Sequence, residues 1–433
     1  MSSASGECSR IEPGLEDVGL VVSNAEQQNS TPNAPDRASV LFTAFEPSGD
    51  DHASTVIREL KRMHPEVQVF AWGGPKMESA GANLIERTGE DAVMGVPGIT
   101  KIIDHQRINA RIEKWMGEHH VSAHVPVDSP AANFPICAIA KKRGVRVVHL
   151  VAPQIWAWGR WRIHKLRRLT DLVLCLLPFE ERFFDRRRVP ARFVGHMLFD
   201  EPLDFGTLDR IASAYPKGEP RIAMMPGSRP DELLRNFPLI LESFRTVKER
   251  FPGAVGVVAA TSEPVARHLR EMAGEHGGWP NGVSIAVGNT DAVVRWCQFA
   301  LVKSGTVTLQ VAKQGRPMVV FYKKSNVPMY WLAKLVLSTK TFTLPNLIAG
   351  KRIVPEFVPH FAGAEPISAE LLRLIEQPEV AEQQRRDQAE MVGLFAGLRA
   401  SEASARAIAD VLGLEKVNAR APVAPSRLTP ATA

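Results

Sequence analysis

Cysteines and long apolar runs are scarce in this sequence, and each shortage excludes a class of protein. The four cysteines form no CxxC pair, and no histidine lies at metal-ligand spacing from any of them: Cys8, Cys137, Cys175 and Cys297. This excludes a zinc finger and a disulfide scaffold and favours a reducing compartment. No stretch reaches the roughly 18 uninterrupted apolar residues that span a bilayer, so we expect no integral membrane protein. Residues 1–13 lack the basic and apolar regions of a secretory signal, which we therefore do not expect.

The common nucleotide-binding signatures are missing as well. The chain contains neither a Walker A sequence nor GxGxxG, and Gly73-Gly74-Pro75 is a poor substitute for either. This argues against a P-loop protein and against a conventional dinucleotide-binding enzyme. No known nucleic-acid-binding module is recognisable, so we expect no nucleic-acid partner.

The composition is that of a folded protein. The chain has 433 residues, of which 45% are apolar and 23% charged, a balance that argues against wholesale disorder. Its length is sufficient for two or three domains. The pattern predicts a disordered acidic arm over 1–38 and a disordered tail over 414–433, because both segments are polar or proline-rich and lack a sustained period.

Positive charge is concentrated in one segment. The formal net charge is +6, yet residues 141–192 alone hold fourteen basic and four acidic residues, while residues 1–38 carry six acidic and two basic ones. Trp156, Trp158 and Trp161 lie within the basic segment. Two interpretations remain open: a solvated helix face whose tryptophans belong to the core, or a surface that meets anionic lipid headgroups.

Short apolar runs alternate with amphipathic stretches along most of the chain. Strands are expected at 39–45, 67–74, 145–153, 254–260, 284–288, 299–306 and 318–323, with another ending within 123–130 and a strand with a tight turn at 221–229. A basic amphipathic helix is expected at 99–116. Such alternation predicts parallel sheets with helices on both faces. Two similar α/β units in tandem imply a cleft between them. We expect one domain over 39–205, a second over 206–378, and closing helices over 379–413.

Two strand-to-helix turns of the second unit are suited to phosphate. Gly227, Ser228 and Arg229 follow an expected strand, with Glu232 three residues later. Glycine permits close backbone approach, a helix N-terminus attracts anions, and arginine adds a bidentate donor. The next such junction carries Ser304-Gly305-Thr306, and Gln310, one turn further on, could reach a ribose. The alternatives are an ordinary glycine turn with a surface ion pair, and a plain N-cap.

Carboxylates follow two expected strands of the first unit. Glu46, Ser48, Gly49 and Asp50 come directly after the first strand, with Ser48 or Asp50 expected to cap the next helix. Asp128 ends another strand, and Asn133 follows it. Sites of α/β proteins lie at the carboxyl ends of strands. A carboxylate there can accept a proton from a hydroxyl, although an N-cap role for Asp128 is the simpler alternative.

Together the motifs resemble the lipid-A-disaccharide synthase family over residues 39–413. The matching pieces are Glu46 with Ser48-Gly49-Asp50, Gly74-Pro75 with Met77 and Gly81, Val93-Met94-Gly95, Asp128-Ser129-Pro130 with Asn133, Pro153-Gln154-Ile155-Trp156-Ala157-Trp158, Pro178-Phe179-Glu180, Val194-Gly195-His196, Pro226-Gly227-Ser228-Arg229 with Glu232, Ser304-Gly305-Thr306, Gly315-Arg316-Pro317-Met318, and Leu344-Pro345-Asn346 with Ala349-Gly350. Their order and spacing match the family, and such a set is far more specific than any one piece.

The resemblance implies a GT-B fold of two Rossmann-like domains, with the nucleotide on the second and the acceptor on the first. It implies UDP-2,3-diacylglucosamine as donor, 2,3-diacylglucosamine 1-phosphate as acceptor, and a β-1,6-linked disaccharide phosphate and UDP as products. It further implies an inverting reaction without metal or other cofactor. The protein would attach to the cytoplasmic face of the inner membrane and could form a dimer with exchanged C-terminal parts.

The resemblance also assigns roles to residues. Asp128 would be the base that deprotonates the acceptor hydroxyl. The predicted nucleotide-binding set is Gly227, Ser228, Arg229, Glu232, Ser304, Gly305, Thr306, Gln310 and Asn346. The predicted acceptor-binding or site-shaping set is Glu46, Ser48, Gly49, Asp50, Asn133, Trp156, Trp158 and Arg160. From their charge, we also expect Arg160, Arg162 and the helix 99–116 to face anionic lipid or the 1-phosphate of the acceptor.

The sequence departs from the family near the expected site. Ala131 stands where the family usually has a second aspartate, and Gln310 where it usually has glutamate. Pro47 and Ala53 replace small residues of the first motif, the latter a usual glycine. Two further hypotheses therefore stay open: a GT-B relative that uses another acceptor, and a non-catalytic protein that binds a UDP-sugar or lipid.

Overall fold

The computed structural model describes residues 38–88, 98–323, 339 and 341–414, without the side chains of 98–103. The predicted acidic arm, the predicted tail and the motif Val93-Met94-Gly95 lie outside these ranges, apart from Ala38 and Leu414 at their edges. Both sheets described below belong to one compact unit, residues 38–433.

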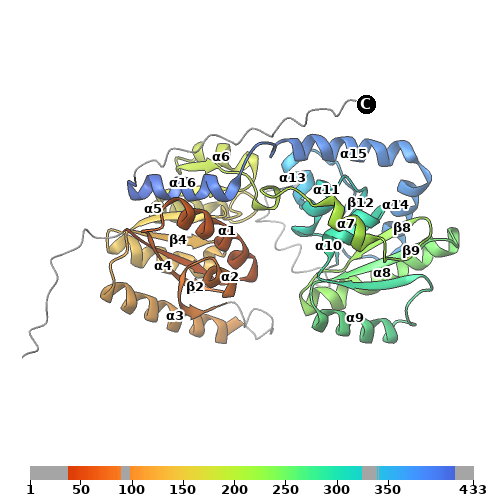
Figure 1. Ribbon diagram of the computed structural model, residues 1–433, viewed down its shortest axis with the longest axis horizontal. Coiled ribbons are helices and arrows are strands. Elements are labelled where there is room, and N and C mark those ends of the chain that lie inside the picture. The colour runs from red at the N-terminus through yellow and green to blue at the C-terminus, as the bar shows by residue number, and fades with distance from the viewer. Residues whose placement is uncertain (1–37, 89–97, 324–338, 340, 415–433) are drawn as a thin grey trace, which may run out of the picture. The chain divides into compact units, whose positions relative to one another are not determined.

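Parallel strands form two separate sheets (Figure 1). The first has the order β3-β2-β1-β4-β5-β6-β7 and contains β1 (Ser39–Ala44), β2 (Gln68–Gly73), β3 (Asn83–Arg87), β4 (Ala123–Val127), β5 (Arg146–Leu150), β6 (Leu172–Cys175) and β7 (Ala191–Phe193). The second has the order β10-β9-β8-β11-β12-β13 and contains β8 (Arg221–Met225), β9 (Val255–Ala260), β10 (Val283–Val287), β11 (Phe299–Lys303), β12 (Met318–Lys323) and β13 (Glu356–His360). In each sheet the strand order reverses beside the first strand, the position at which α/β sheets bind ligands.

Helices connect the strands and cover both faces of each sheet. Those of the first half are α1 (Pro47–Met63), α2 (Pro75–Ser79), α3 (Gly98–Glu118), α4 (Pro130–Lys142), α5 (Ile163–Leu169) and α6 (Pro178–Asp185). Those of the second half are α7 (Phe205–Ala212), α8 (Pro230–Arg250), α9 (Glu263–Glu275), α10 (Thr290–Trp296), α11 (Val307–Lys313), α13 (Leu344–Ala349), α14 (Glu365–Glu376), α15 (Pro378–Gly393) and α16 (Ala400–Leu412). The basic helix predicted at 99–116 is confirmed as α3.

Strand β1 shows how the first sheet is buried on both faces. Val40 and Phe42 point into a core that also contains α1 and α16. Leu41, with Phe45 just past the strand, points into a second core that contains α3, α4 and α5. A strand between two cores has to be apolar on both sides. This explains why the sequence reads as a continuous apolar run there.

The last two helices pack on different sheets. Helix α15 packs against α11, α13 and α14, beside the second sheet, whereas α16 packs against α1 and β5 of the first. The N-terminus of α16 is capped by a residue two hundred positions away. The carboxylate of Asp200 accepts hydrogen bonds from the backbone of Ala400 (2.6 Å) and Ser401 (2.8 Å) and from the Ser401 hydroxyl (2.5 Å). This charged cap fixes where α16 begins.

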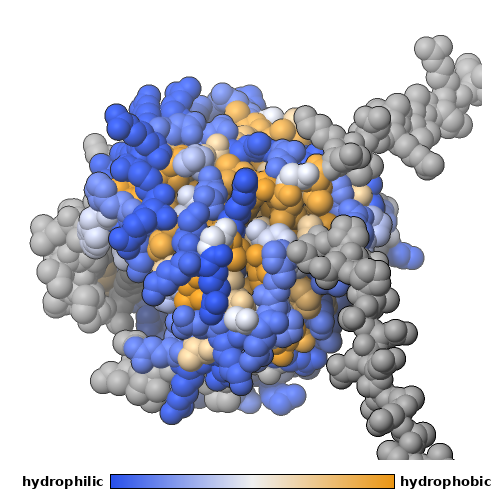
Figure 2. All heavy atoms as spheres, turned by 90° about the vertical axis from the view of Figure 1, so that its left-hand side faces the viewer, coloured by the Kyte–Doolittle hydropathy of each residue, from blue (hydrophilic) through white to orange (hydrophobic). Residues whose placement is uncertain are grey.

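The surface is mixed in polarity. In the view of Figure 2, hydrophilic residues cover much of the face, and apolar areas lie between them. No helix within the described residues is long and apolar enough to cross a membrane.

Candidate active site

The first candidate group lies where β1 and β4 end. These strands are neighbours in register, with Ala44 opposite Val127. Glu46 follows β1 and Asp128 follows β4, so both carboxylates lie at the same edge of the sheet. The hydroxyl of Ser129 connects the two loops by donating to Oε1 of Glu46 at 3.0 Å. The structure therefore brings Glu46, Asp128 and Ser129 together at this edge of the sheet.

Asp128 lies in an unusual backbone conformation. Its φ is 48° and that of Ser129 is 37°, values in the left-handed region that non-glycine residues rarely adopt. The Asp128 N–H donates to the carbonyl of Leu150 at 3.0 Å. Burial raises the pKa of the Asp128 carboxyl above its ordinary value, and the nearby Glu46 charge raises it further. Strained backbone and a basic carboxylate together are typical of functional positions.

Asn133 supports this loop from inside the protein. Its side chain is fully buried. The amide nitrogen donates to the carbonyls of Val127 (3.1 Å) and Asp128 (3.0 Å), and the amide oxygen accepts from the Thr43 hydroxyl at 2.6 Å. All three contacts are within the protein, so Asn133 shapes the site rather than presenting its side chain to a ligand.

Asp50 also has a structural position. The expectation that Ser48 or Asp50 caps the following helix is wrong, because α1 begins at Pro47 and has no side-chain cap. The carboxylate of Asp50 instead accepts from the backbone of Lys76 (3.1 Å) and Met77 (2.9 Å) at the start of α2. A Cβ on Gly74 would lie 2.3 Å from Asp50 Oδ2, which explains why glycine precedes Pro75. Ser48 is exposed.

The other residues of the first motif are explained by packing. A Cβ on Gly49 would lie 3.1 Å from the Ala44 side chain, so this position needs a very small residue. Pro47 occupies the first turn of α1, where its missing N–H is not needed. Ala53 is fully buried in α1. The departures at Pro47 and Ala53 are therefore compatible with the local fold.

The second candidate group follows β8. Gly227 has a φ of 110°, and a Cβ there would lie 2.9 Å from Glu232 Oε2, so both conformation and space require glycine. Ser228 and Arg229 are exposed at the start of α8. This turn joins the end of a strand to a helix of 21 residues, as the sequence predicts.

A chain of charges connects the two groups. Glu46 Oε2 lies 3.4 Å from Nη2 of Arg229, whose Nη1 lies 3.4 Å from Glu232 Oε1. Glu232 also accepts from Lys303 Nζ at 2.8 Å, with both side chains largely buried. Glu232 therefore neutralises Lys303 beneath the turn. Arg229 is 63% exposed and its pairs are long, so it is held weakly.

Ser304, Gly305 and Thr306 form the turn between β11 and α11. No side-chain cap is present, and α11 has only seven residues. The alternative of a serine or threonine side-chain N-cap is therefore wrong. Gln310 lies half-buried in α11. The structure thus brings this turn beside the Lys303–Glu232 pair, since Lys303 ends β11.

Asn346, which the family resemblance assigns to the nucleotide-binding set, makes its hydrogen bonds inside the protein. It is fully buried, and its amide oxygen accepts from the backbone of Ile353 (2.7 Å) and Val354 (2.9 Å). The amide nitrogen donates to the Val354 carbonyl (3.0 Å) and to Glu356 Oε2 (2.9 Å). Glu356, which the sequence analysis missed, also accepts from Thr343. Asn346 therefore holds the loop between α13 and β13.

The tryptophans of the basic segment divide between core and surface. Trp156 is buried and donates through its indole nitrogen to Glu180 Oε1 at 2.9 Å. Trp158 and Trp161 are 46% and 63% exposed. Arg160 is exposed between them, and the Arg162 guanidinium stacks on the Trp158 ring at 3.7 Å. The core interpretation is thus confirmed for Trp156, whereas contact of the exposed part with anionic lipid stays a prediction.

Glu180 is a further group that the sequence analysis left without a role. Its side chain is buried and also accepts from the backbone of Leu177 at 3.0 Å. Burial raises the pKa of Glu180 to about 7, and the Asp128 charge contributes to the increase. The signal in the sequence was its place in the motif after β6. Glu180 therefore links two parts of the candidate site: it accepts a hydrogen bond from Trp156, and its charge interacts with that of Asp128.

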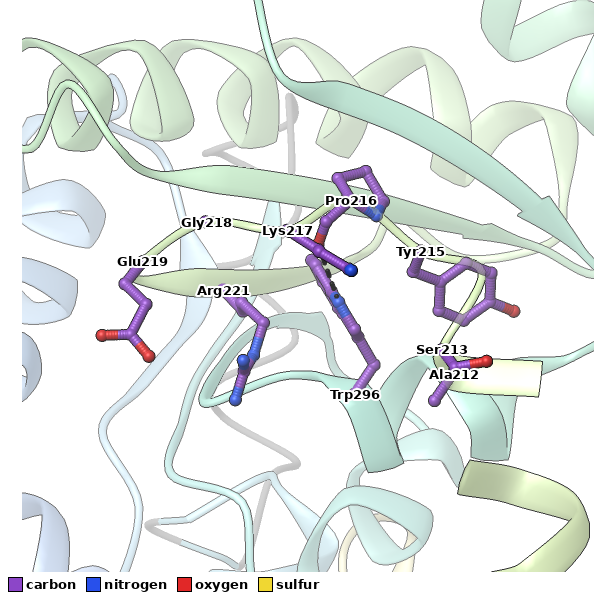
Figure 3. A pocket seen from close by; sticks show the side chains of 9 residues that line it. All are labelled: Ala212, Ser213, Tyr215, Pro216, Lys217, Gly218, Glu219, Arg221 and Trp296. Atoms are coloured by element: carbon purple, nitrogen blue, oxygen red, sulfur yellow. Dashed lines mark hydrogen bonds between the residues drawn. The ribbon is translucent and has the colours of Figure 1, made fainter. Parts of the chain in front are cut away.

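Two other features lie apart from these groups. A pocket of about 570 Å³ is lined by Tyr215, Arg221 and Trp296 among others (Figure 3). Arg221 begins β8, so this pocket lies at the amino end of that strand, opposite to the turn at Gly227. Within the described residues no three His, Cys, Asp or Glu side chains are grouped to hold a metal. The predicted absence of a metal stays a prediction.

Two parallel sheets, each with helices on both faces, define a GT-B protein, the fold class that the family resemblance implied. Solved structures share this fold. The S. aureus MnaA–UDP co-structure has a TM-score of 0.61 at 11% identity and covers 87% of this chain and 98% of that one. The structure of the glycotransferase of kitacinnamycin has a TM-score of 0.58 at 16% identity, with 86% and 98% coverage.

Sequence comparison gives the family. The lipid-A-disaccharide synthetase family model matches residues 40–411. The lipid-A-disaccharide synthase of Anaeromyxobacter dehalogenans strain 2CP-C is 37% identical over 342 residues, which cover 78% of this chain and 88% of the relative. The lipid-A-disaccharide synthase of Geobacter metallireducens is 30% identical over 387 residues, which cover 87% of this chain and 98% of the relative. The chain therefore belongs to the lipid-A-disaccharide synthase family and is a glycosyltransferase of lipid A biosynthesis.

Proposed function

We propose that the protein transfers the diacylglucosamine unit of UDP-2,3-diacylglucosamine to 2,3-diacylglucosamine 1-phosphate. The 6-hydroxyl of the acceptor attacks the anomeric carbon, the bond to UDP breaks, and the configuration inverts to a β-1,6 link. The products are the disaccharide 1-phosphate and UDP. Family membership supports this choice of acceptor. The candidate site offers a carboxylate that can act as the base and a turn that can bind the diphosphate.

Asp128 is the proposed base, and its setting is the observation that carries the proposal. Its carboxylate follows a strand end, beside a loop that contains Glu46, and its pKa is raised by burial and by that neighbour. A carboxylate of raised pKa accepts the hydroxyl proton more readily as the carbon–oxygen bond forms. Hydrogen bonds from the Asp128 N–H to the Leu150 carbonyl and from Asn133 to the Asp128 carbonyl hold the group at one position.

The turn at Gly227–Arg229 is the proposed site of the UDP diphosphate. Backbone N–H groups at the start of α8 and the positive end of its dipole stabilise anionic oxygens. Arg229 is exposed and only weakly paired with Glu46, so a diphosphate can replace that partner. These groups stabilise the charge that develops on departing UDP. Ser304, Gly305, Thr306 and Gln310 are the remaining proposed contacts to the nucleotide.

The exposed tryptophans and arginines of the basic segment are the proposed contact with an anionic membrane. Trp158 and Trp161 expose large rings beside Arg160 and Arg162, a combination suited to the headgroup region. We place the protein on the cytoplasmic face of the inner membrane, as the resemblance implies. Sedimentation with vesicles of anionic and neutral lipid tests this. Trp161→Ala should weaken binding to anionic vesicles, and equal binding to both vesicle types would contradict the proposal.

A dimer with exchanged C-terminal parts is the proposed oligomer. In such a dimer α16 would pack on the first sheet of the partner, with the Asp200 cap made between chains. Light scattering of the purified protein measures this state directly. A monomer at micromolar concentration would contradict the proposal.

The reaction is tested with purified protein, UDP-2,3-diacylglucosamine and 2,3-diacylglucosamine 1-phosphate in detergent containing EDTA. We expect the disaccharide 1-phosphate by mass spectrometry and an equal amount of UDP. UDP release without disaccharide would favour another acceptor, for which Ala131 at the start of α4 is the observed departure. Neither product, from protein that binds UDP, would favour a non-catalytic binding protein.

Asp128→Ala tests the base. We expect turnover to fall at least about 100-fold, the lower range for loss of a general base, while the affinity for UDP is unchanged. Asp185→Ala is the matched control, because Asp185 is an exposed aspartate at the end of α6 in the same half of the chain. Turnover within twofold of the parent would rule out the role of Asp128.

A further inference from the structure

Two buried polar residues lie in the apolar core beneath Asp128. Thr43 in β1 and His124 in β4 are both fully buried. On the same face of the sheet, their neighbours include Leu41, Phe45 and the apolar side of α4. Burying polar groups in such a core is unfavourable unless their hydrogen bonds are made. A threonine and a histidine at these positions therefore require a reason.

The two side chains are connected to the Asp128 loop through Asn133. His124 Nε2 lies 2.9 Å from Thr43 Oγ1, and the Thr43 hydroxyl lies 2.6 Å from the amide oxygen of Asn133. The Asn133 amide nitrogen in turn donates to the carbonyls of Val127 and Asp128. The chain of contacts thus runs from the core to the backbone of the proposed base.

The direction of each hydrogen bond follows from these contacts. Since two carbonyls accept from the Asn133 nitrogen, its oxygen has to face Thr43. The Thr43 hydroxyl has one proton and gives it to that oxygen, so it can only accept from His124. His124 must therefore donate through Nε2. Its Nδ1 is buried and has no acceptor among the described residues, so it carries no proton and the ring is neutral. Burial agrees with this, because it lowers the pKa of His124 to about 3.

The loop that contains Asp128 and Ser129 needs hydrogen bonds to hold its conformation. Asp128 and Ser129 both have positive φ, and each non-glycine residue in that region is strained by about 1–3 kcal/mol. No side-chain hydrogen bond caps the following helix α4 at Ser129. The bond from Asn133 to the Asp128 carbonyl and that from Asp128 N–H to Leu150 hold the peptide groups on either side of Asp128.

We propose that Thr43 and His124 are positioning residues, which fix Asn133 and through it hold Asp128 in its left-handed conformation beside the acceptor. This rests on the proposed role of Asp128 as the base. A base displaced by about 1 Å can lose about 100-fold in rate. The network therefore acts on the catalytic step and leaves the binding of donor and acceptor largely unchanged.

Thr43→Val tests the proposal, since it keeps the shape of the side chain and removes the hydroxyl. We expect kcat to fall about 10- to 100-fold with both KM values within about twofold. Thr43→Ser restores the donor and should recover most of kcat. Thr170→Val is the matched control, because the Thr170 hydroxyl is also buried in this half of the chain but has no partner. Wild-type kcat in Thr43→Val, or an equal loss in Thr170→Val, would overturn the proposal.

Nuclear magnetic resonance tests the network independently of turnover. The imidazole nitrogen shifts of wild-type His124 should report a neutral ring protonated on Nε2, and the opposite tautomer would overturn the proposal. The amide signals of Asp128 and Ser129 should move in Thr43→Val and stay in place in Thr170→Val. If the wild-type protein forms no disaccharide, the proposed reaction fails, while these signals still decide whether Thr43 and His124 hold the loop.

Discussion

Asn346→Ala separates a structural role of this residue from direct contact with the nucleotide. The substitution leaves the buried N–H groups of Ile353 and Val354 without their acceptor. Each orphaned buried donor is destabilising by about 1–3 kcal/mol, so the pair is worth about 2–6 kcal/mol. Since a whole domain is stable by only about 5–15 kcal/mol, the loss should be conspicuous.

Urea unfolding followed by circular dichroism measures this loss as a lower midpoint. The matched control is Asn289→Ala, because Asn289 is exposed and its side chain makes one hydrogen bond, to the Val287 carbonyl. We expect the control to change the free energy of unfolding by less than about 1 kcal/mol. If Asn346→Ala were as stable as the control and had lost UDP binding, its amide would face the nucleotide, and the structural argument would be refuted.

Two further predictions concern pH and nucleotide affinity. Burial lowers the pKa of His149 to about 4, and neither ring nitrogen has a partner. The unfolded state therefore binds more protons between about pH 4 and 6.5, and stability falls as the pH drops through that window. His149→Leu should reduce the slope of the unfolding free energy against pH in this window by up to about 1.4 kcal/mol per pH unit, as measured by unfolding at several pH values. An unchanged slope would show that His149 is not the group responsible. Gln310→Glu should tighten UDP binding several-fold by calorimetry, since a charged hydrogen bond exceeds a neutral one by about 1 kcal/mol; unchanged or weaker binding would remove Gln310 from the ribose site.

The sequence predicts most of the strands but misses one edge strand of each sheet. The run at 318–323 is confirmed as β12, because a strand buried on both faces is continuously apolar. The two strands that the sequence does not predict are β3 (Asn83–Arg87) and β13 (Glu356–His360), both short and both at sheet edges. Their patterns are weak because edge strands are only partly buried, and β13 contains Pro359.

The site is predictable in outline and unpredictable in its connections. The grouping of Asp128 with Glu46 follows from strand order, since the carboxyl ends of neighbouring parallel strands meet. The roles of Asp50 and Asn346 cannot be predicted from strand order, because their partners are backbone groups whose direction depends on how a loop folds. Arg229 contacts Glu46, which lies 183 positions away in the chain. No local sequence pattern predicts this contact.

Helix α16 has a consequence for the order in which the protein can fold during synthesis. Ala405, Ala407 and Ile408 belong to the same core as Val40 and Phe42, so the core of the first sheet is completed by residues that are made only after the second sheet. While the ribosome makes the second sheet, the early core lacks one of its helices and exposes apolar surface. The nascent chain is therefore vulnerable to aggregation or to docking of another chain's helix until residue 412 has emerged.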